Sequence, residues 1–315
     1  MTEHQTATTL CARGLTRRFG NHAAVEDASF EVRRGEVLGF LGPNGAGKTT
    51  TMHMLTGNLA PTRGSISVCG IDLLEEPTRA KAKIGYLPEI PPLYRELSVD
   101  EYLTLAARLH RIERGARAAA VGRARNRCGL AEVGRKLIGA LSKGYQQRVG
   151  IAQAIVHDPE VLILDEPTAG LDPNQIREIR SLIRELGGRH SVILSTHILP
   201  EVEAVCDRVQ IMHHGRLVYS DTIGALEKFH SGRALLVGLR RPPPESALAA
   251  IAGVTAVERA GETVFRVRCA DGADPAEEIA RCAVAGNWGL YELTRAQTTL
   301  EEVFVQLTRS EALAA

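Results

Sequence analysis

The feature that most constrains the fold is a glycine-rich segment between an apolar strand and a helix. Residues 42–49 read Gly-Pro-Asn-Gly-Ala-Gly-Lys-Thr, which matches the pattern GxxxxGK followed by Ser or Thr. The mostly apolar run Val37–Leu41 precedes it, and no helix breaker follows Lys48 until Gly57. A strand, a glycine loop and a helix in this order are the context that the pattern needs in order to bind phosphate. The chain is therefore expected to fold around a nucleotide-binding loop.

The chemistry of this loop assigns roles to its residues. Glycines let the backbone wrap around an anion, so that successive amides and the helix N-terminus face the phosphate oxygens. Lys48 is expected to reach the β- and γ-phosphates, and Thr49 to hold Mg²⁺. Because the chain has six lysines against 32 arginines, a lysine here indicates a site that needs a compact point charge. The residues expected to bind the nucleotide are Gly42, Pro43, Asn44, Gly45, Ala46, Gly47, Lys48, Thr49 and Thr50.

A second apolar strand ends in two acidic residues. Val161–Leu164 is continuously apolar, and Asp165 and Glu166 follow it directly. A solvated strand end would explain two acids, but a buried strand that delivers carboxylates beside a phosphate loop fits a metal site better. We expect Asp165 to hold Mg²⁺ through its water shell. Glu166 is expected to orient or deprotonate the attacking water, since phosphoryl transfer depends on positioning and charge compensation.

The pattern along the chain predicts an α/β fold built on a phosphate-loop core. Short strands and helices alternate between about residues 8 and 220, which is typical of a mostly parallel sheet covered on both faces, here with an antiparallel β edge. A helical stretch over about residues 92–140 interrupts this alternation. Ser98 and Glu101 form a capping box near its start. We interpret this stretch as an inserted helical subdomain.

The composition shifts near residue 221. Residues 221–233 are interpreted as a linker, which includes a short helix-like stretch. Residues 234–315 are interpreted as an accessory α+β domain, ferredoxin-like in outline, that ends in a helix over 298–308.

Composition excludes several other classes of protein. The 315 residues are 44% apolar and 24% charged, which is ordinary for a globular chain. The net charge of +1 argues against non-specific binding of nucleic acid. No uncharged apolar run approaches the roughly 18 residues that cross a bilayer, and the start of the chain does not resemble a signal peptide. The six scattered cysteines are expected to be reduced thiols. A cytosolic protein is expected, with any membrane role provided by a partner.

One further motif narrows the class of ATPase. Residues 141–147 read Leu-Ser-Lys-Gly-Tyr-Gln-Gln, which resembles the LSGGQ signature of the nucleotide-binding subunits of ATP-binding-cassette transporters. It lies between the phosphate loop and Asp165, in the order found in that family, and the resemblance covers roughly residues 8–220. It implies a cassette that traps two ATP molecules between two head-to-tail subunits. One chain alone should then be nearly inactive.

The resemblance also implies roles for individual residues. Phe19 would stack on adenine, although a lone phenylalanine is more often a core residue. Ser142 and Gly144 would contact the γ-phosphate held by the opposite subunit. Asp172 would lie in the loop through which each subunit senses the other's site, and it would also serve as a helix cap. His197 would donate a hydrogen bond to the γ-phosphate.

The sequence departs from the family pattern in two motifs, the signature and the loop before the helical subdomain. Where the signature most often reads GGQ, this chain has Lys143, Gly144 and Tyr145. Where the loop before the helical subdomain commonly has glutamine, this chain has Glu89, which keeps a carbonyl-type oxygen toward Mg²⁺ or water but adds a charge. We hypothesise that Glu89 links the nucleotide to the membrane partner. Glu89 and the segment 299–304 resemble the corresponding sequences in one branch of the family. That branch consists of exporters whose membrane subunits are separate chains.

The sequence thus predicts an ATPase subunit of an exporter, with Glu166, His197 and Lys48 as catalytic residues and ATP and Mg²⁺ as cofactors. Its partners would be a second cassette, in a homodimer, and a separate permease that holds it at the inner face of the membrane; no nucleic acid is expected. The alternative is a soluble cassette ATPase acting on DNA or ribosomes. A regulatory subunit without hydrolysis is disfavoured because Lys48, Asp165, Glu166 and His197 are all present.

Overall fold

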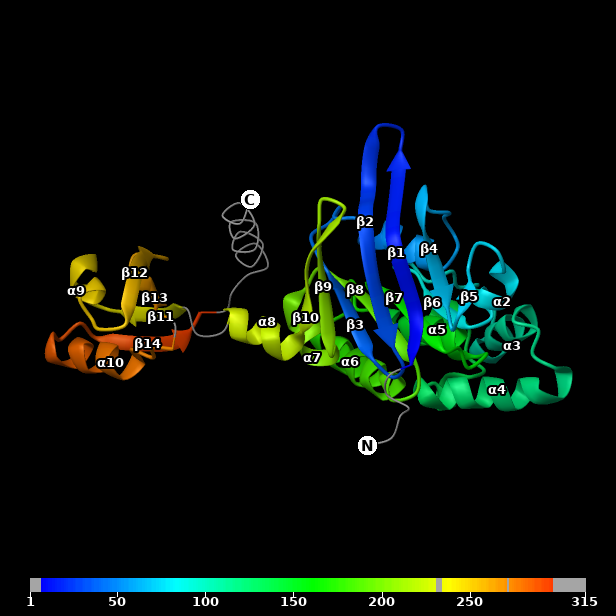
Figure 1. The fold of residues 1–315 in the computed structure, drawn as a ribbon. Helices are drawn as coiled ribbons and strands as arrows, with labels where there is room; N and C mark the ends of the chain where they lie inside the picture. The colour runs from blue at the N-terminus through cyan, green and yellow to red at the C-terminus, as the bar shows by residue number, and fades with distance from the viewer. Residues whose placement is uncertain (1–6, 231–233, 271, 297–315) are drawn as a thin grey trace. The chain divides into compact units, whose positions relative to one another are not determined.

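The computed structural model describes residues 7–230, 234–270 and 272–296 (Figure 1). The chain divides into two compact units, with the boundary between Ile223 and Gly224. The helix predicted over 298–308 and the segment 299–304 lie outside the described residues. All six cysteines are free thiols, as predicted.

A six-stranded sheet forms the centre of the first unit. Its strands are β3 (Val37–Leu41), β6 (Ile84–Leu87), β7 (Val161–Asp165), β8 (Ser191–Thr196), β9 (Arg208–His213) and β10 (Arg216–Thr222). Their order is β10-β9-β3-β8-β7-β6, and every neighbouring pair is parallel except β9 with β10. Every residue of β3, β7 and β8 is buried, as expected for parallel strands covered on both faces. The mostly parallel sheet with an antiparallel edge is therefore confirmed.

A second, antiparallel sheet packs against one face of the first (Figure 1). Its strands are β1 (Thr8–Phe19), β2 (His22–Arg33), β4 (Arg63–Val68) and β5 (Ile71–Asp72), in the order β2-β1-β4-β5. The shared core contains Phe30 and Phe40, whose rings meet edge to face with centroids 4.8 Å apart. This core fixes β3, and with it the start of the glycine loop.

Helices cover the remaining surface of the parallel sheet. They are α1 (Lys48–Leu55), α2 (Pro77–Lys81), α5 (Lys143–Ile155), α6 (Pro173–Gly187) and α7 (Leu199–Val205). Helix α5 lies close to β6, because a Cβ atom on Gly85 would be 2.1 Å from the carbonyl oxygen of Ala154. Glycine is therefore required at this contact.

The segment between β6 and α5 is helical. It contains α3 (Val99–Leu109), α4 (Arg114–Arg127) and two 3-10 turns, Ala131–Val133 and Ile138–Ala140. The capping box at the start of α3 is confirmed, since the Ser98 hydroxyl accepts from the Glu101 amide at 3.3 Å and the Glu101 carboxylate accepts from the Ser98 amide at 2.8 Å. The start of this segment is thus specified locally.

The second unit is a small antiparallel sheet with two helices. Its elements after α8 (Ile223–His230) are β11 (Ala234–Leu239), α9 (Glu245–Ala249), β12 (Val254–Arg259), β13 (Val264–Cys269), α10 (Ala276–Ala285) and β14 (Leu290–Arg295). The sheet order is β12-β13-β11-β14, which with this chain order is the ferredoxin-like split βαβ arrangement. Within the predicted linker, residues 221–222 end β10 and residues 223–230 form α8, where the sequence indicates a helix-like stretch.

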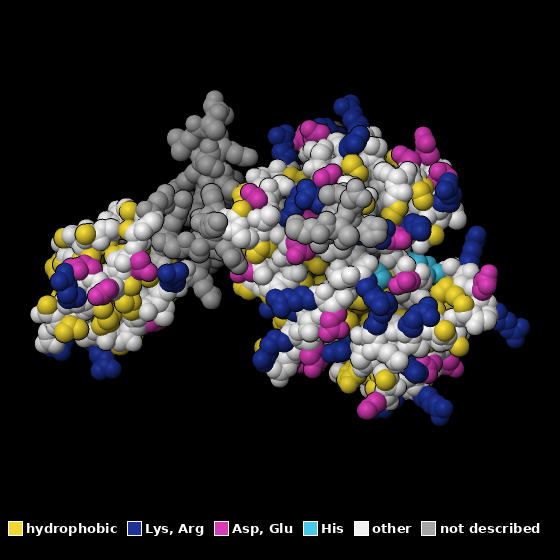
Figure 2. Space-filling view, turned by 60° about the horizontal axis from the view of Figure 1, so that its bottom comes forward, with side chains coloured by type: hydrophobic (Ala, Val, Ile, Leu, Met, Phe, Trp, Pro, Cys, Tyr) yellow, Lys and Arg dark blue, Asp and Glu magenta, His cyan; other side chains and the backbone are white. Residues whose placement is uncertain are grey.

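Charged side chains of both signs are mixed on the face that Figure 2 shows. On the face in Figure 2, basic and acidic side chains alternate among the described residues. Among those same residues, no helix has both the length and the apolar character needed to cross a bilayer.

Candidate nucleotide site and signature loop

The glycine loop joins β3 to α1 and leaves the N-terminus of α1 open. Gly47, the N-cap of α1, has φ 107°, and a Cβ atom there would lie 2.5 Å from the carbonyl oxygen of Ala24. A Cβ atom on Gly42 would lie 2.4 Å from the carbonyl oxygen of Met212. Only glycine fits such close approaches. No side chain in the described part of the chain caps the first turn of α1, so its amides remain available to an anion.

Lys48 is the buried cation of the site. It is only 6% exposed, and its Nζ atom donates to the carbonyl oxygens of Gly42, at 2.7 Å, and Pro43, at 3.2 Å. The same atom lies 3.4 Å from Oε1 of Glu166. A buried ammonium needs such partners. The loop, the lysine and the predicted base are therefore already assembled around one charge.

Asp165 ends β7 with one unsatisfied oxygen. The side chain is 1% exposed and accepts a short hydrogen bond from the Ser195 hydroxyl, whereas its Oδ2 atom has no hydrogen-bond partner. A buried carboxylate oxygen without a partner is costly. A carboxylate oxygen is also a ligand that Mg²⁺ prefers. The residues present therefore fit a Mg²⁺ ion bound at Asp165.

Glu166 connects the lysine to the histidine. Its Oε2 atom lies 3.0 Å from Nδ1 of His197, and its amide donates to the hydroxyl and the carbonyl oxygen of Ser195, both at 3.1 Å. Its φ of 47° is in the left-handed region, which is uncommon for a residue other than glycine and is often found at functional sites. The backbone of Glu166 therefore holds its carboxylate between Lys48 and His197.

One cavity of about 380 Å³ brings most of the predicted residues together. It is lined by Ala24, Asn44, Gly45, Gly47, Lys48, Thr49, Thr50, Glu89, Glu166, Ala169 and His197. The phosphate loop, the predicted base, the histidine and Glu89 thus face the same space, although they come from four separate stretches of the sequence.

The predicted residues that do not line this cavity are Phe19, Gly42, Pro43, Ala46, Ser142, Gly144, Asp165 and Asp172. Phe19 is 49% exposed and so does not lie in the core, which was the alternative to stacking on adenine; the Arg17 guanidinium lies 4.6 Å from the centre of its ring. Asp172 caps α6, because its carboxylate accepts from the amides of residues 174 and 175 at 2.9 and 3.0 Å. The predicted cap is confirmed.

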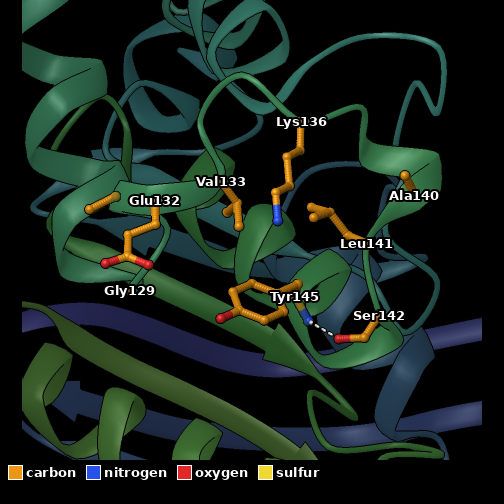
Figure 3. Close-up of a pocket in the computed structure, with 9 residues that line it drawn as sticks. Gly129, Glu132, Val133, Lys136, Ala140, Leu141, Ser142 and Tyr145 are labelled. Atoms are coloured by element: carbon orange, nitrogen blue, oxygen red, sulfur yellow. Dashed lines mark hydrogen bonds between the residues drawn. The ribbon is translucent and has the colours of Figure 1, made fainter.

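Ser142 and Gly144 lie at the start of α5, and Ser142 lines a cavity of about 620 Å³ that Figure 3 shows. The Ser142 hydroxyl caps the helix by accepting from the Tyr145 amide at 3.4 Å. Tyr145 lines the same cavity and is 41% exposed. The signature loop is therefore a surface feature, separate from the cavity that holds Lys48.

Sequence reasoning missed two residues that organise the site. Ser195 supports both Asp165 and Glu166, as described above. Glu201 is 1% exposed and accepts from the hydroxyls of Thr168, at 2.6 Å, and Thr196, at 2.7 Å. It therefore ties together the chain after β7 and the end of β8. Burial was the missing information, since neither residue stands out by its type or spacing.

Comparisons with known proteins agree with this geometry. A family model described as ABC transporter matches residues 25–169, and a shorter match to an AAA domain covers residues 138–202. An uncharacterised ABC transporter ATP-binding protein of Bacillus subtilis (strain 168), YxlF, is 40% identical over 219 residues, 70% of this chain and 72% of its own length. This chain belongs to the ATP-binding subunits of ABC transporters. It is therefore an ATPase whose hydrolysis of ATP powers transport.

The similarity extends over the whole chain in other members. The daunorubicin resistance ATP-binding protein DrrA3 of Streptomyces coeruleorubidus is 34% identical over 310 residues, 96% of each chain. A solved structure, an ATP-binding subunit of an ABC transporter, is 33% identical with a TM-score of 0.64 and covers 70% of this chain and 93% of its own. The alternative, a soluble cassette ATPase acting on DNA or ribosomes, is not favoured, because this chain belongs to the ATP-binding subunits of transporters.

Proposed function

We propose that two copies of this subunit trap two ATP molecules head to tail and drive export through a separate membrane permease. What supports this is the separation of the two half-sites. Lys48, Thr49 and Glu166 face one cavity, whereas Ser142 and Gly144 lie outside it. A complete site then needs the signature loop of a second copy, as in an isologous two-fold dimer.

The chain's own residues divide the chemistry between them. The open amides of the glycine loop and Lys48 would bind the phosphates. Thr49 and Asp165 would hold Mg²⁺, with Glu89 facing it; the ion would supply neutralisation of phosphate charge. Glu166 would accept the proton of the attacking water at Oε2, the oxygen that His197 already contacts. His197 would keep that carboxylate oriented and donate to the γ-phosphate.

Two further assignments concern the nucleotide base and the direction of transport. Half-exposed Phe19 would offer one ring face to adenine, since its other face is covered by Arg17. Export is proposed because a relative that matches nearly the whole chain is a daunorubicin resistance protein. The dimer would then work at the cytoplasmic face of the membrane, bound to the permease.

The test compares two substitutions in the full-length protein. Glu166→Gln should retain ATP and form a stable dimer while hydrolysis falls by about 10²-fold or more. Lys48→Ala should lose nucleotide affinity, because the buried ammonium is the cation of the loop. Glu160→Gln, near the opposite end of β7, is the matched control and should hydrolyse ATP normally. Full turnover by the Glu166→Gln protein would refute the assignment of the base.

A further inference from the structure

Two of the residues that depart from the family pattern, Glu89 and Lys143, lie around the same cavity. Glu89 and Lys143 both line a second cavity, of about 600 Å³, beside the nucleotide cavity. Its lining is Glu89, Ile90, Pro91, Leu93, Arg95, Lys143, Gln146, Gln147, Ala169 and Gly170. One cavity is thus lined by two unusual charges. Glu89 has a carboxylate where the family commonly has an amide, and Lys143 has an ammonium where the family commonly has glycine.

The charges around this second cavity are complementary and unpaired. Glu89 is the acidic residue of the lining, and Lys143 and Arg95 are the basic ones. In the part of the chain that the structure describes, none of these three side chains makes an ion pair. Opposite charges that share a concave space attract each other more strongly than they would in open water.

Lys143 occupies an unfavourable place in its helix. It is the first residue of α5, where the positive end of the helix dipole disfavours a cation. Its Nζ atom nevertheless lies against the backbone of Gly170, because a Cβ atom there would be 2.2 Å away. The positive charge of Lys143 therefore lies at the wall of the second cavity in spite of the helix dipole.

The nucleotide cavity and the second cavity share part of their wall. Glu89 and Ala169 line both of them. Because Gly170 follows Ala169 directly, the Lys143 ammonium lies next to this shared wall. Glu89 therefore borders both the cavity that Lys48 and Thr49 line and the cavity that Lys143 lines.

We propose that Lys143 is a positioning residue that acts as the charge partner of Glu89. The Lys143 ammonium attracts the Glu89 carboxylate across the second cavity without a direct ion pair in the structure, and Mg²⁺ bound with ATP would compete for that carboxylate. Lys143 then sets how much Mg²⁺ is needed before Glu89 joins the nucleotide. The inference rests on the proposed position of Glu89 beside the metal, and it links the signature loop to the nucleotide within one subunit.

The experiment is a double-mutant cycle read out by binding. All variants carry Glu166→Gln, and the Kd for ATP is measured by fluorescence at increasing Mg²⁺ to give the half-saturating Mg²⁺ concentration. Lys143→Met should lower that concentration by about 3- to 10-fold, because the competitor for Glu89 is gone. In the Glu89→Gln background the same substitution should change it by less than about twofold. Lys143→Arg should restore most of the native value.

The controls separate the inference from the proposed function. Arg95→Met removes the same charge from the same lining, away from Gly170, and should have the smaller effect. If Lys143→Met shifts the Mg²⁺ requirement equally with and without Glu89→Gln, the effect is that of any nearby cation; the inference is then overturned and the proposed function stands. If Glu89→Ala, which removes the side-chain oxygens, leaves the Mg²⁺ requirement unchanged, Glu89 does not face the metal, and both that assignment and the inference fail.

Discussion

At the scale of single residues, the site is organised by the neighbours of its acidic groups. Ser195 donates to Asp165 and accepts from the amide of Glu166, and Lys48 lies against the Glu166 carboxylate. These groups are buried, so removal of one partner leaves another charge or polar atom uncompensated. The residues that hold the two carboxylates should therefore matter almost as much as the carboxylates themselves.

Ser195→Ala tests this dependence. The substitution removes the hydroxyl that orients Asp165, so we expect the Mg²⁺ requirement for hydrolysis to rise by about tenfold, as for other residues that orient a metal ligand. Titration of ATPase activity with Mg²⁺ measures it. Ser191→Ala is the matched control, since Ser191 is buried at the other end of β8 and hydrogen-bonds to Thr9. An equal shift in both variants would show that only the stability of β8 had changed.

At the scale of elements, the sequence predicts the local motifs, such as helix caps and the glycine loop. It does not predict the contacts between residues that are far apart in the chain. The glycine loop, the Ser98 capping box and the Asp172 cap each lie within a few residues of the chain, so the sequence predicts them directly. Ser195 meets Asp165 across neighbouring strands, and Glu89, in the loop after β6, shares a cavity with Lys143 of α5. Such pairs depend on strand order and helix packing, which periodicity does not specify.

The contact of α5 with β6 gives a prediction about packing. Gly85→Ala places a Cβ atom 2.1 Å from the Ala154 carbonyl oxygen, so the helix must shift. We expect a loss of about 1–3 kcal/mol in the free energy of unfolding. Gly122→Ala in α4 is the opposite case, because nothing lies within 4 Å of its added Cβ atom, and it should stabilise by about 0.5–1 kcal/mol. Urea unfolding distinguishes the two; equal effects would contradict the close contact.

Two stacked histidines at the ends of α3 and α5 give a prediction about pH. The rings of His110 and His157 stack with centroids 3.6 Å apart, and Nε2 of His157 lies 3.0 Å from the Ile84 carbonyl oxygen. Burial, reinforced by His110 and His190, lowers the pKa of His157 to about 4, although Asp158 and the Ile84 hydrogen bond oppose this. Burial also lowers the pKa of His110. The folded protein therefore holds His157 neutral.

Because the unfolded chain protonates His157 first, stability should fall as the pH drops from about 6.5 toward 4, by at most about 1.4 kcal/mol per pH unit from this group. His157→Gln keeps a donor for Ile84 but does not titrate, so it should lose less stability between pH 7.5 and 5.5. Urea unfolding at both pH values measures the difference. His22→Gln, at an exposed histidine on β2, should behave like the native protein; identical pH slopes for all three would exclude this role of His157.

At the scale of the whole molecule, the groups proposed to serve a second copy are adjacent. A Cβ atom on Gly144 would lie 2.7 Å from Cδ of Gln175, so the start of α5 packs against the start of α6. Ser142 caps the first helix and Asp172 caps the second. The signature loop and the Asp172 loop thus form one continuous surface outside the nucleotide cavity. Such a surface suits an isologous interface, in which each copy offers the same patch.

Mixing two inactive variants tests this arrangement. Lys48→Ala abolishes the phosphate loop of one copy, and Ser142→Arg blocks the signature loop of the other. In a head-to-tail dimer, the loop of the Ser142→Arg copy meets the intact signature of the Lys48→Ala copy, so one site is complete. A 1:1 mixture should therefore recover up to about a quarter of native activity, because half of the dimers are mixed and each has one good site of two. Phosphate release with the permease present measures this recovery; if the mixture stays as inactive as either variant alone, the loop and the signature do not meet across two copies.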